Sequence, residues 1–149
     1  MIKAIETSYK GYRFRSRLEA RWAIVFDALG IKWEYEKEGY DLGNKGWYLP
    51  DFSIITSEDL YWFCEVKGDL DDKNGIEKSR FLDNHSPDPY MGVIMLTSLD
   101  FAYKKFSKDG FDFNNAFVTS QMLDVSISSF NKAIKRARSA RFEHGEKGG

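Results

Sequence analysis

This chain has little cysteine, little histidine and no long apolar run, and each shortage argues against a class of protein. Its single cysteine, Cys64, cannot form an internal disulfide, so we expect a protein of a reducing compartment such as the cytoplasm. Neither His85 nor His144 has a second histidine or a cysteine at ligand spacing, which argues against a zinc site. The longest apolar stretches, such as 93–96, are strand-sized and far too short to cross a membrane. The opening residues are polar and charged, so no secretory signal is expected.

The chain also lacks an excess of positive charge, because its formal net charge at pH 7 is -1. Acidic residues concentrate at 34–41 and 58–72, whereas basic residues concentrate near the two ends of the chain. Local basic surface matters more for nucleic-acid binding than net charge does. The basic residues that we consider candidates for contact with nucleic acid are Arg13, Arg15, Arg17, Arg21, Lys132, Lys135 and Arg136.

A length of 149 residues corresponds to one domain with a core of its own. We expect this domain at 1–144, followed by a disordered tail at 145–149. Hydrophobic periodicity predicts a sequence of helix, three strands, helix, strand, strand and helix, which indicates an α/β fold with a mixed central sheet flanked by helices. The predicted helices are 15–29, 73–82 and 126–142, and the predicted strands are 31–36, 47–55, 61–66, 92–97 and 116–119.

Three charged residues fall close together if the second and third predicted strands form a hairpin. A hairpin symmetric about Glu58 places Asp51 directly opposite Glu65. Opposed residues share one face of a sheet, with Cβ atoms about 5 Å apart. Lys67 lies two residues beyond Glu65, so it emerges on the same face. The sequence therefore predicts two carboxylates and an ammonium at one edge of the sheet.

This grouping predicts a metal site, because two like charges so close destabilise a sheet unless something offsets them. A divalent cation does so, and hard oxygen ligands select magnesium, for which manganese can substitute. Held by Asp51 and Glu65, with the carbonyl of Val66 as a third ligand, the metal would activate water for phosphodiester hydrolysis. Lys67 would orient that water or neutralise developing phosphate charge. The alternative is that each carboxylate is a solvated charge at a strand end, since the pattern alone is weak.

Segments at both ends and in the centre of the chain resemble small phage and prophage proteins of the PD-(D/E)XK nuclease superfamily. They are 12–22 (YRFRSRLEARW), 48–52 (YLPDF) with 65–68 (EVKG), and 140–145 (ARFEHG). Any one of these motifs is weak, but together they are fairly specific and span essentially the whole chain. The resemblance implies a restriction-endonuclease-like core and metal-dependent cleavage of DNA. It also implies that Asp51 and Glu65 are metal ligands and that Lys67 is the catalytic lysine.

Glu19 has two alternative roles. Ser16 and Glu19 match the capping box, in which a serine and a glutamate three residues later satisfy backbone N–H groups at the start of a helix. By the resemblance, Glu19 is instead the acidic residue that the first helix lends to the metal site. On a helical wheel Glu19 lies at the margin of the apolar face, and such a position is compatible with the metal role.

The basic cluster near the C-terminus lies on a predicted amphipathic helix. Its apolar residues share one face, and Lys132, Lys135 and Arg136 share the opposite face. A surface that tracks phosphates needs this arrangement, but an ordinary solvated helix has it too. Aromatic residues of the predicted strands could stack on bases, although such residues more often belong to the core. These aromatic residues are Trp33, Tyr35, Trp47 and Tyr48.

We therefore expect a magnesium-dependent DNA endonuclease, by the resemblance encoded by a phage or another mobile element and acting in the cytoplasm of a bacterial host. The alternatives are a non-catalytic nucleic-acid-binding protein that keeps the fold, and a junction-resolving or homing nuclease. A pure binding protein has no need of paired carboxylates near an anionic ligand, which favours the enzyme. DNA is the expected partner and a membrane is not. The choices between DNA and RNA and between monomer and homodimer stay open.

Overall fold

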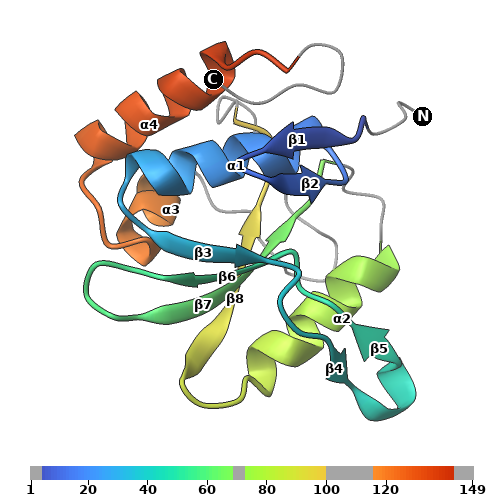
Figure 1. Cartoon of the computed structure of the whole chain (residues 1–149). Helices are drawn as coiled ribbons and strands as arrows, with labels where there is room; N and C mark the ends of the chain where they lie inside the picture. Colours follow the sequence, from blue (N-terminus) through green and yellow to red (C-terminus); the bar gives the residue numbers. More distant parts are fainter. Residues whose placement is uncertain (1–4, 69–72, 100–115, 143–149) are drawn as a thin grey trace.

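The computed structural model describes residues 5–68, 73–99 and 116–142, and it is an α/β structure built around a four-stranded sheet (Figure 1). The strand order is β3–β6–β7–β8, with the first two neighbouring pairs antiparallel and β7 parallel to β8. This mixed sheet flanked by helices confirms the predicted class. The strands are β3 (Lys32–Tyr35), β6 (Phe52–Ile55), β7 (Tyr61–Val66) and β8 (Tyr90–Leu96).

The hairpin of β6 and β7 has the predicted register. Phe52 pairs with Cys64 and Ile55 pairs with Tyr61, so the hairpin is symmetric about Glu58. The turn is closed by a hydrogen bond of 2.9 Å from the backbone N–H of Thr56 to the carbonyl of Leu60. This register matters because a slip of one residue would move every side chain of the hairpin to the other face of the sheet.

Helices cover both faces of the sheet (Figure 1). Helices α1 (Arg17–Ala28) and α4 (Ile127–Ser139) pack on one face, and α2 (Lys73–Asn84) packs on the other. Successive residues of a strand point to opposite faces. Cys64 accordingly belongs to the cluster beneath α1, whereas its neighbour Phe63 belongs to the cluster beneath α2.

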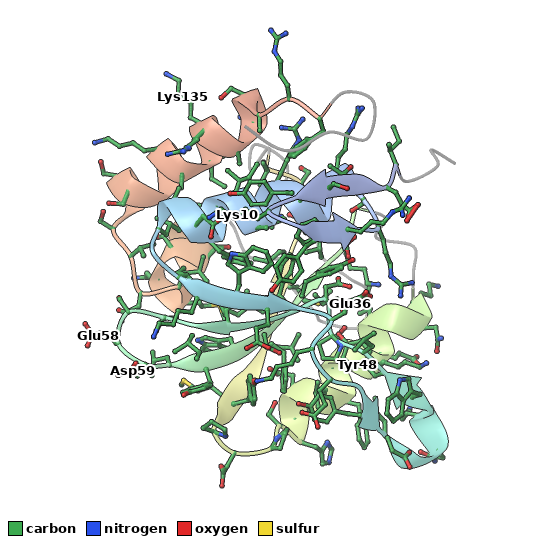
Figure 2. All side chains as sticks on the ribbon, viewed as in Figure 1. Lys10, Glu36, Tyr48, Glu58, Asp59 and Lys135 are labelled. Carbon is green, nitrogen blue, oxygen red and sulfur yellow. The ribbon has the colours of Figure 1, made fainter. Side chains whose placement is uncertain are left out.

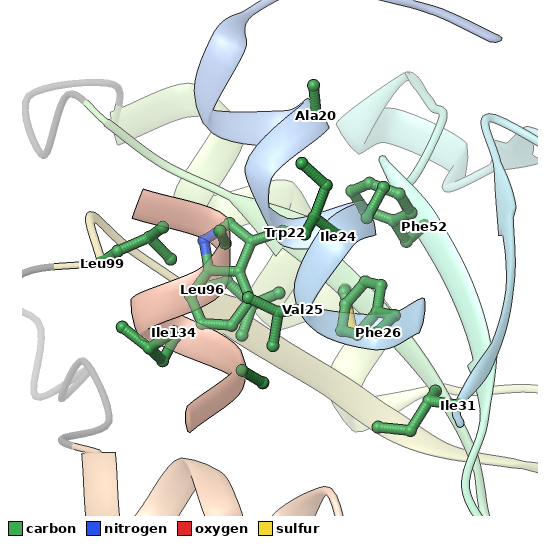
Figure 3. Packing of buried hydrophobic residues seen from close by; sticks show 14 of the residues in the cluster. Ala20, Trp22, Ile24, Val25, Phe26, Ile31, Phe52, Leu96, Leu99 and Ile134 are labelled. Carbon is green, nitrogen blue, oxygen red and sulfur yellow. The ribbon is translucent and has the colours of Figure 1, made fainter. Parts of the chain in front are cut away.

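The larger cluster lies between α1, α4 and the sheet (Figure 3). Trp22 and Phe26 of α1 are fully buried there, and Phe26 meets Phe52 edge-on with 5.2 Å between ring centroids. The indole N–H of Trp22 donates a hydrogen bond of 2.8 Å to the carbonyl of Thr97. Burial of each such side chain contributes about 1.5–3 kcal/mol, so this cluster fixes α1, and Glu19 with it, against the sheet.

A hairpin before α1 is absent from the sequence-based prediction. Strands β1 (Thr7–Tyr9) and β2 (Tyr12–Phe14) are antiparallel and are joined by Lys10 and Gly11, both with positive φ. Two positive φ values are typical of a type I′ turn, but Lys-Gly is a much weaker signal for it than Asn-Gly. The hairpin brings Phe14 into the main core, where it is fully buried.

The strand predicted at 47–55 is wrong as a single strand. Its first part is β5 (Trp47–Tyr48), which pairs with β4 (Tyr40–Asp41) around a 3-10 turn, η1 (Gly43–Lys45). The central sheet is rejoined only at β6. Pro50 lies at the break, and proline cannot donate a backbone hydrogen bond to a sheet. Tyr48 therefore leaves the central sheet and lies between the β4–β5 ribbon and α2 (Figure 2).

The strand predicted at 116–119 is also wrong, because these residues begin helix α3 (Ala116–Met122). A short apolar run fits a strand and a buried helix equally well. The helix prevails because it carries Leu123 into the main core, with a hydrogen bond of 3.0 Å from the N–H of Leu123 to the carbonyl of Thr119. The predicted tail at 145–149 lies outside the described residues.

No helix in the described part of the chain is long and apolar enough to span a membrane.

Candidate active site

The predicted charged residues meet where β6 begins and β7 ends. Asp51 directly precedes β6. Glu65 is the penultimate residue of β7, and Lys67 directly follows that strand. The carboxylate of Asp51 reaches across to β7, where its Oδ2 accepts a hydrogen bond of 2.8 Å from the N–H of Val66. The N–H of Lys67 donates to the carbonyl of Leu96 at 2.8 Å, which ties the end of β7 to β8. These contacts hold the carboxylate of Asp51 against β7 and fix the backbone from which the side chains of Glu65 and Lys67 extend.

Glu65 is buried, with 5% of its surface exposed, and each of its two carboxylate oxygens has a protein partner. Its Oε1 accepts a hydrogen bond of 2.5 Å from the hydroxyl of Tyr48. Its Oε2 lies 2.9 Å from the Nζ of Lys67. A buried carboxylate without such partners would be strongly destabilising, so both contacts help to keep Glu65 in place.

Glu19 reaches the same region from the first turn of α1 and is 6% exposed. The Oγ of Ser16 accepts a hydrogen bond of 3.1 Å from the N–H of Glu19, which confirms Ser16 as the N-cap. The Ser16 hydroxyl also donates to Oε1 of Glu19 at 3.2 Å. The helix cap therefore depends on the side chain of Ser16 and on the backbone of Glu19. The Glu19 carboxylate is turned toward Asp51 and Tyr35, with which it interacts.

The carboxylates around Asp51 raise its proton affinity. Burial raises the pKa of Asp51 well above its usual value, and the charges of Glu65 and Glu19 raise it further, against the opposing effects of the Val66 N–H and of Lys67. Burial likewise raises the pKa of Glu19. Glu65 and Asp51 share the positive charge of Lys67, so the cluster retains a need for a proton or a further cation.

The donor set suits a hard divalent cation. Carboxylate oxygens are the ligands that magnesium and manganese prefer, and the Val66 peptide lies beside them through its bond to Asp51. Within the described residues, however, no three acidic, histidine or cysteine side chains form a ready-made metal cage. Their oxygens are directed at protein partners such as Val66, Tyr48 and Lys67. A cation would have to draw the carboxylates together by rotation of side chains.

Arg15 lies at the rim of this cluster, at the end of α1 that carries Glu19. Its Nε is 2.9 Å from Oε2 of Glu36, and its backbone N–H donates to the hydroxyl of Tyr35 at 3.2 Å. Glu36 in turn donates its N–H to the carbonyl of Asp51 at 2.8 Å. Most of the Arg15 side chain is exposed, so its charge is available to an anion that approaches the carboxylates.

The other N-terminal arginines have different surroundings. Arg13 is exposed and lies 3.2 Å from Glu6. Arg17 and Arg21 donate to backbone carbonyls at and beyond the end of α4, Arg17 to Phe142 at 3.0 Å and Arg21 to Ala137 at 2.5 Å, with further bonds to Arg138 and Ala140. Unpaired carbonyls at a helix C-terminus favour such cationic partners. Arg17 and Arg21 thus have structural roles that sequence analysis did not foresee.

The basic face of α4 is directed to solvent. Phe130, Ala133, Ile134 and Ala137 are buried against the main core, whereas Lys132, Lys135 and Arg136 are exposed. Figure 2 shows Lys135 on the outer side of this helix. The structure therefore confirms the amphipathic docking of the predicted helix, and the basic face is free for a partner.

The aromatic candidates for base stacking differ in accessibility. Tyr48 is buried, and Trp33 and Tyr35 pack partly buried against the main core. Trp47 is 63% exposed on the β4–β5 ribbon and alone among the four presents most of its surface to solvent. In the sequence, Tyr48 belongs to the 48–52 motif and to the aromatic candidates for stacking, but its bond to Glu65 is not evident there. The available signal was its position directly before the Leu-Pro-Asp segment.

No family model, curated protein or solved structure matches this chain.

Proposed function

We propose that this protein is a metal-dependent endonuclease that hydrolyses DNA phosphodiester bonds, with a core of the PD-(D/E)XK type. The order of elements along the chain supports this specific core within the α/β class. The order is α1, the central strands β3, β6 and β7, then α2 and β8. In the PD-(D/E)XK superfamily, as the sequence resemblance implies, the acidic and lysine residues occupy the ends of the central hairpin strands. Asp51, Glu65 and Lys67 occupy those positions here.

One observation carries the proposal: three carboxylates and a lysine, from α1, the start of β6 and the end of β7, meet at one end of a largely buried hairpin. Glu65 and Lys67 are 2.9 Å apart, and Asp51 interacts with both Glu65 and Glu19. Such a group costs stability in a protein that uses it only for packing. Perturbed pKa values at a cluster of this kind favour a catalytic function.

The residues would divide the chemistry between them. A magnesium ion, when bound by Asp51, Glu65 and Glu19 with the carbonyl of Val66, supplies charge neutralisation and a more acidic water. Lys67 would leave Glu65 and place its ammonium against the phosphate or the attacking water. Arg15 at the rim would bind the approaching phosphate in place of Glu36. The exposed basic face of α4 would hold DNA by contacts with its backbone.

The test is incubation of the purified protein with supercoiled, linear, single-stranded and four-way-junction DNA, and with RNA, in magnesium, manganese or EDTA. Cleavage of at least one of these DNA substrates in magnesium or manganese, but not in EDTA, supports the proposal. Cleavage of RNA alone would contradict the choice of DNA. The pattern among DNA substrates would show whether the enzyme is specific for junctions.

A non-catalytic nucleic-acid-binding protein is the second candidate. The observation that favours it is the satisfaction of the carboxylates by protein partners in the described residues, with no ready-made metal cage. Binding of DNA that is unaffected by metal, without cleavage of any substrate, would favour this alternative over the enzyme.

A further inference from the structure

One of the partners of Glu65 comes from the β4–β5 ribbon and not from the central sheet. Tyr48 belongs to β5, is 5% exposed and donates its hydroxyl proton to Oε1 of Glu65 at 2.5 Å. Charge-assisted hydrogen bonds of this length are among the stronger ones in proteins. Because the break at Pro50 removes Tyr48 from β6, the tyrosine approaches Glu65 from the side of α2.

Helix α2 supports the tyrosine from behind. The Oγ of Ser79 lies 3.0 Å from the Oη of Tyr48, and the Ser79 hydroxyl also lies 2.8 Å from the carbonyl of Gly75. Ser79 is fully buried, so these contacts are shielded from water. The single hydroxyl proton of Tyr48 is committed to Glu65, so the Tyr48 oxygen can only accept, and the one proton of Ser79 is shared between this oxygen and the carbonyl of Gly75. A continuous buried chain thus connects α2 to Glu65.

The two oxygens of Glu65 are held by partners with different freedom. Lys67 follows the end of β7 and, in the proposed function, has to move toward the phosphate. Tyr48 is enclosed between the β4–β5 ribbon and α2, so its contact with Glu65 does not depend on where Lys67 lies. A carboxylate oxygen can accept more than one bond, so Tyr48 leaves Oε1 with capacity for a cation.

We propose that Tyr48 is a positioning residue that fixes the orientation of Glu65 for metal binding, and that Ser79 of α2 supports Tyr48 in this role. The inference rests on the proposed metal-dependent function. Hydrogen-bond partners of metal ligands orient those ligands, and their loss typically weakens metal binding about 10- to 100-fold. The geometry assigns this task to a residue that belongs neither to the charged cluster nor to the central sheet.

The test measures manganese binding to the metal-free full chain by calorimetry, without any substrate. Tyr48→Phe removes the hydroxyl and keeps the ring, and we expect its manganese affinity to be about 10- to 100-fold weaker than that of the wild type. Tyr9→Phe is the matched control, because Tyr9 donates an equivalent bond of 2.6 Å to Asp27 near the C-terminal end of α1. Both variants lose a tyrosine–carboxylate bond, but only Tyr48→Phe should lose manganese affinity.

The outcomes separate the inference from the proposed function. Equal manganese affinity in Tyr48→Phe and the wild type would overturn the role of Tyr48 and leave the metal site standing. Equal losses in Tyr48→Phe and Tyr9→Phe would also overturn it, since the effect would then follow general stability. A wild type that binds no manganese would overturn the metal site itself. If Tyr48→Phe does not fold, the manganese affinity of Ser79→Ala is measured in its place. We expect this affinity to be weaker than that of the wild type, and an unchanged affinity would contradict the inference.

Discussion

At Asp51, burial and the charges of two neighbouring carboxylates all oppose ionisation of the side chain. It is partly buried, it faces Glu65 and Glu19, and its carboxylate is stabilised by the N–H of Val66. Its raised pKa means that the folded protein holds a proton which the unfolded chain releases near pH 4. Between these two pKa values the folded state binds more protons than the unfolded state. The contribution of Asp51 to stability is therefore present below about pH 4 and is lost as pH rises toward the raised pKa.

We predict that Asp51→Asn stabilises the metal-free protein increasingly as pH rises. Asparagine keeps an oxygen that can accept from Val66, but it removes the charge that opposes Glu65 and Glu19. Thermal unfolding in EDTA from about pH 4 to about pH 8 measures the effect, and the variant minus wild-type difference isolates it from other groups. A difference in unfolding temperature that stays constant over this range would contradict the assigned cause.

Glu19 can be separated from the helix cap with which it shares Ser16. Ser16→Ala removes the acceptor for the N–H of Glu19 and should cost about 0.5–2 kcal/mol of unfolding free energy. Glu19→Gln leaves that backbone bond in place, so we expect a smaller change in unfolding free energy but a fall in DNA cleavage by orders of magnitude. Denaturant unfolding and cleavage rates in magnesium measure both effects. Full activity of Glu19→Gln would leave Glu19 with the structural role alone.

At the scale of elements, α1 and α4 are joined by arginine side chains as well as by their apolar faces. Arg21 donates to three carbonyls at the end of α4, and its guanidinium lies 5.3 Å from the ring centroid of Phe142. Arg21→Met keeps much of the apolar stem and removes the donors. We expect it to lower the unfolding free energy by about 1–3 kcal/mol and to leave the salt dependence of DNA binding unchanged. A shallower salt dependence with unaltered stability would instead identify Arg21 as a phosphate contact.

For the exposed face of α4 we expect the opposite: its replacement should change the salt dependence of DNA binding and not the stability. If Lys132, Lys135 and Arg136 each contact a phosphate, their joint replacement by Gln should lower affinity similarly for all DNA sequences. The slope of log K against log salt should become shallower by roughly 0.9 for each lost contact on duplex DNA. Fluorescence anisotropy at several salt concentrations measures the slope.

A control for net charge is available in three exposed lysines outside α4. Replacement of Lys32, Lys37 and Lys45 by Gln removes the same charge from the other side of the α1–α4 layer, and the slope should then change less. Equal slopes for the two triple variants would mean that α4 is a solvated surface and makes no specific contact with phosphates.

Elements were predictable from the sequence where one physical effect dominated. The helix at α1 and the register of β6 with β7 follow from periodicity and from a short symmetric turn. Where two effects compete, the prediction was wrong: Pro50 breaks an otherwise continuous strand pattern, and the run at 116–119 fits either a helix or a strand. The turn at Lys10 and Gly11 carries too weak a signal to predict the first hairpin.

On the scale of the whole molecule, the candidate site combines residues that lie close in sequence with residues brought from a distance. Asp51, Glu65 and Lys67 could be placed together from the sequence because one hairpin holds them. The bond of Tyr48 to Glu65 could not, because it depends on the break at Pro50 and on the packing of α2 against the sheet. Likewise, the approach of Glu19 is set by the burial of α1.

Cleavage of supercoiled plasmid by wild type, Asp51→Asn and Asp59→Asn in magnesium tests the central claim most directly. Asp59 lies in the exposed turn between β6 and β7, so its replacement makes the same change of charge away from the site (Figure 2). We predict that wild type and Asp59→Asn cut the plasmid in magnesium and not in EDTA. Asp51→Asn should bind the plasmid without cutting it. Cleavage by Asp51→Asn at the wild-type rate, or by the wild type in EDTA, would contradict the proposed metal-dependent nuclease.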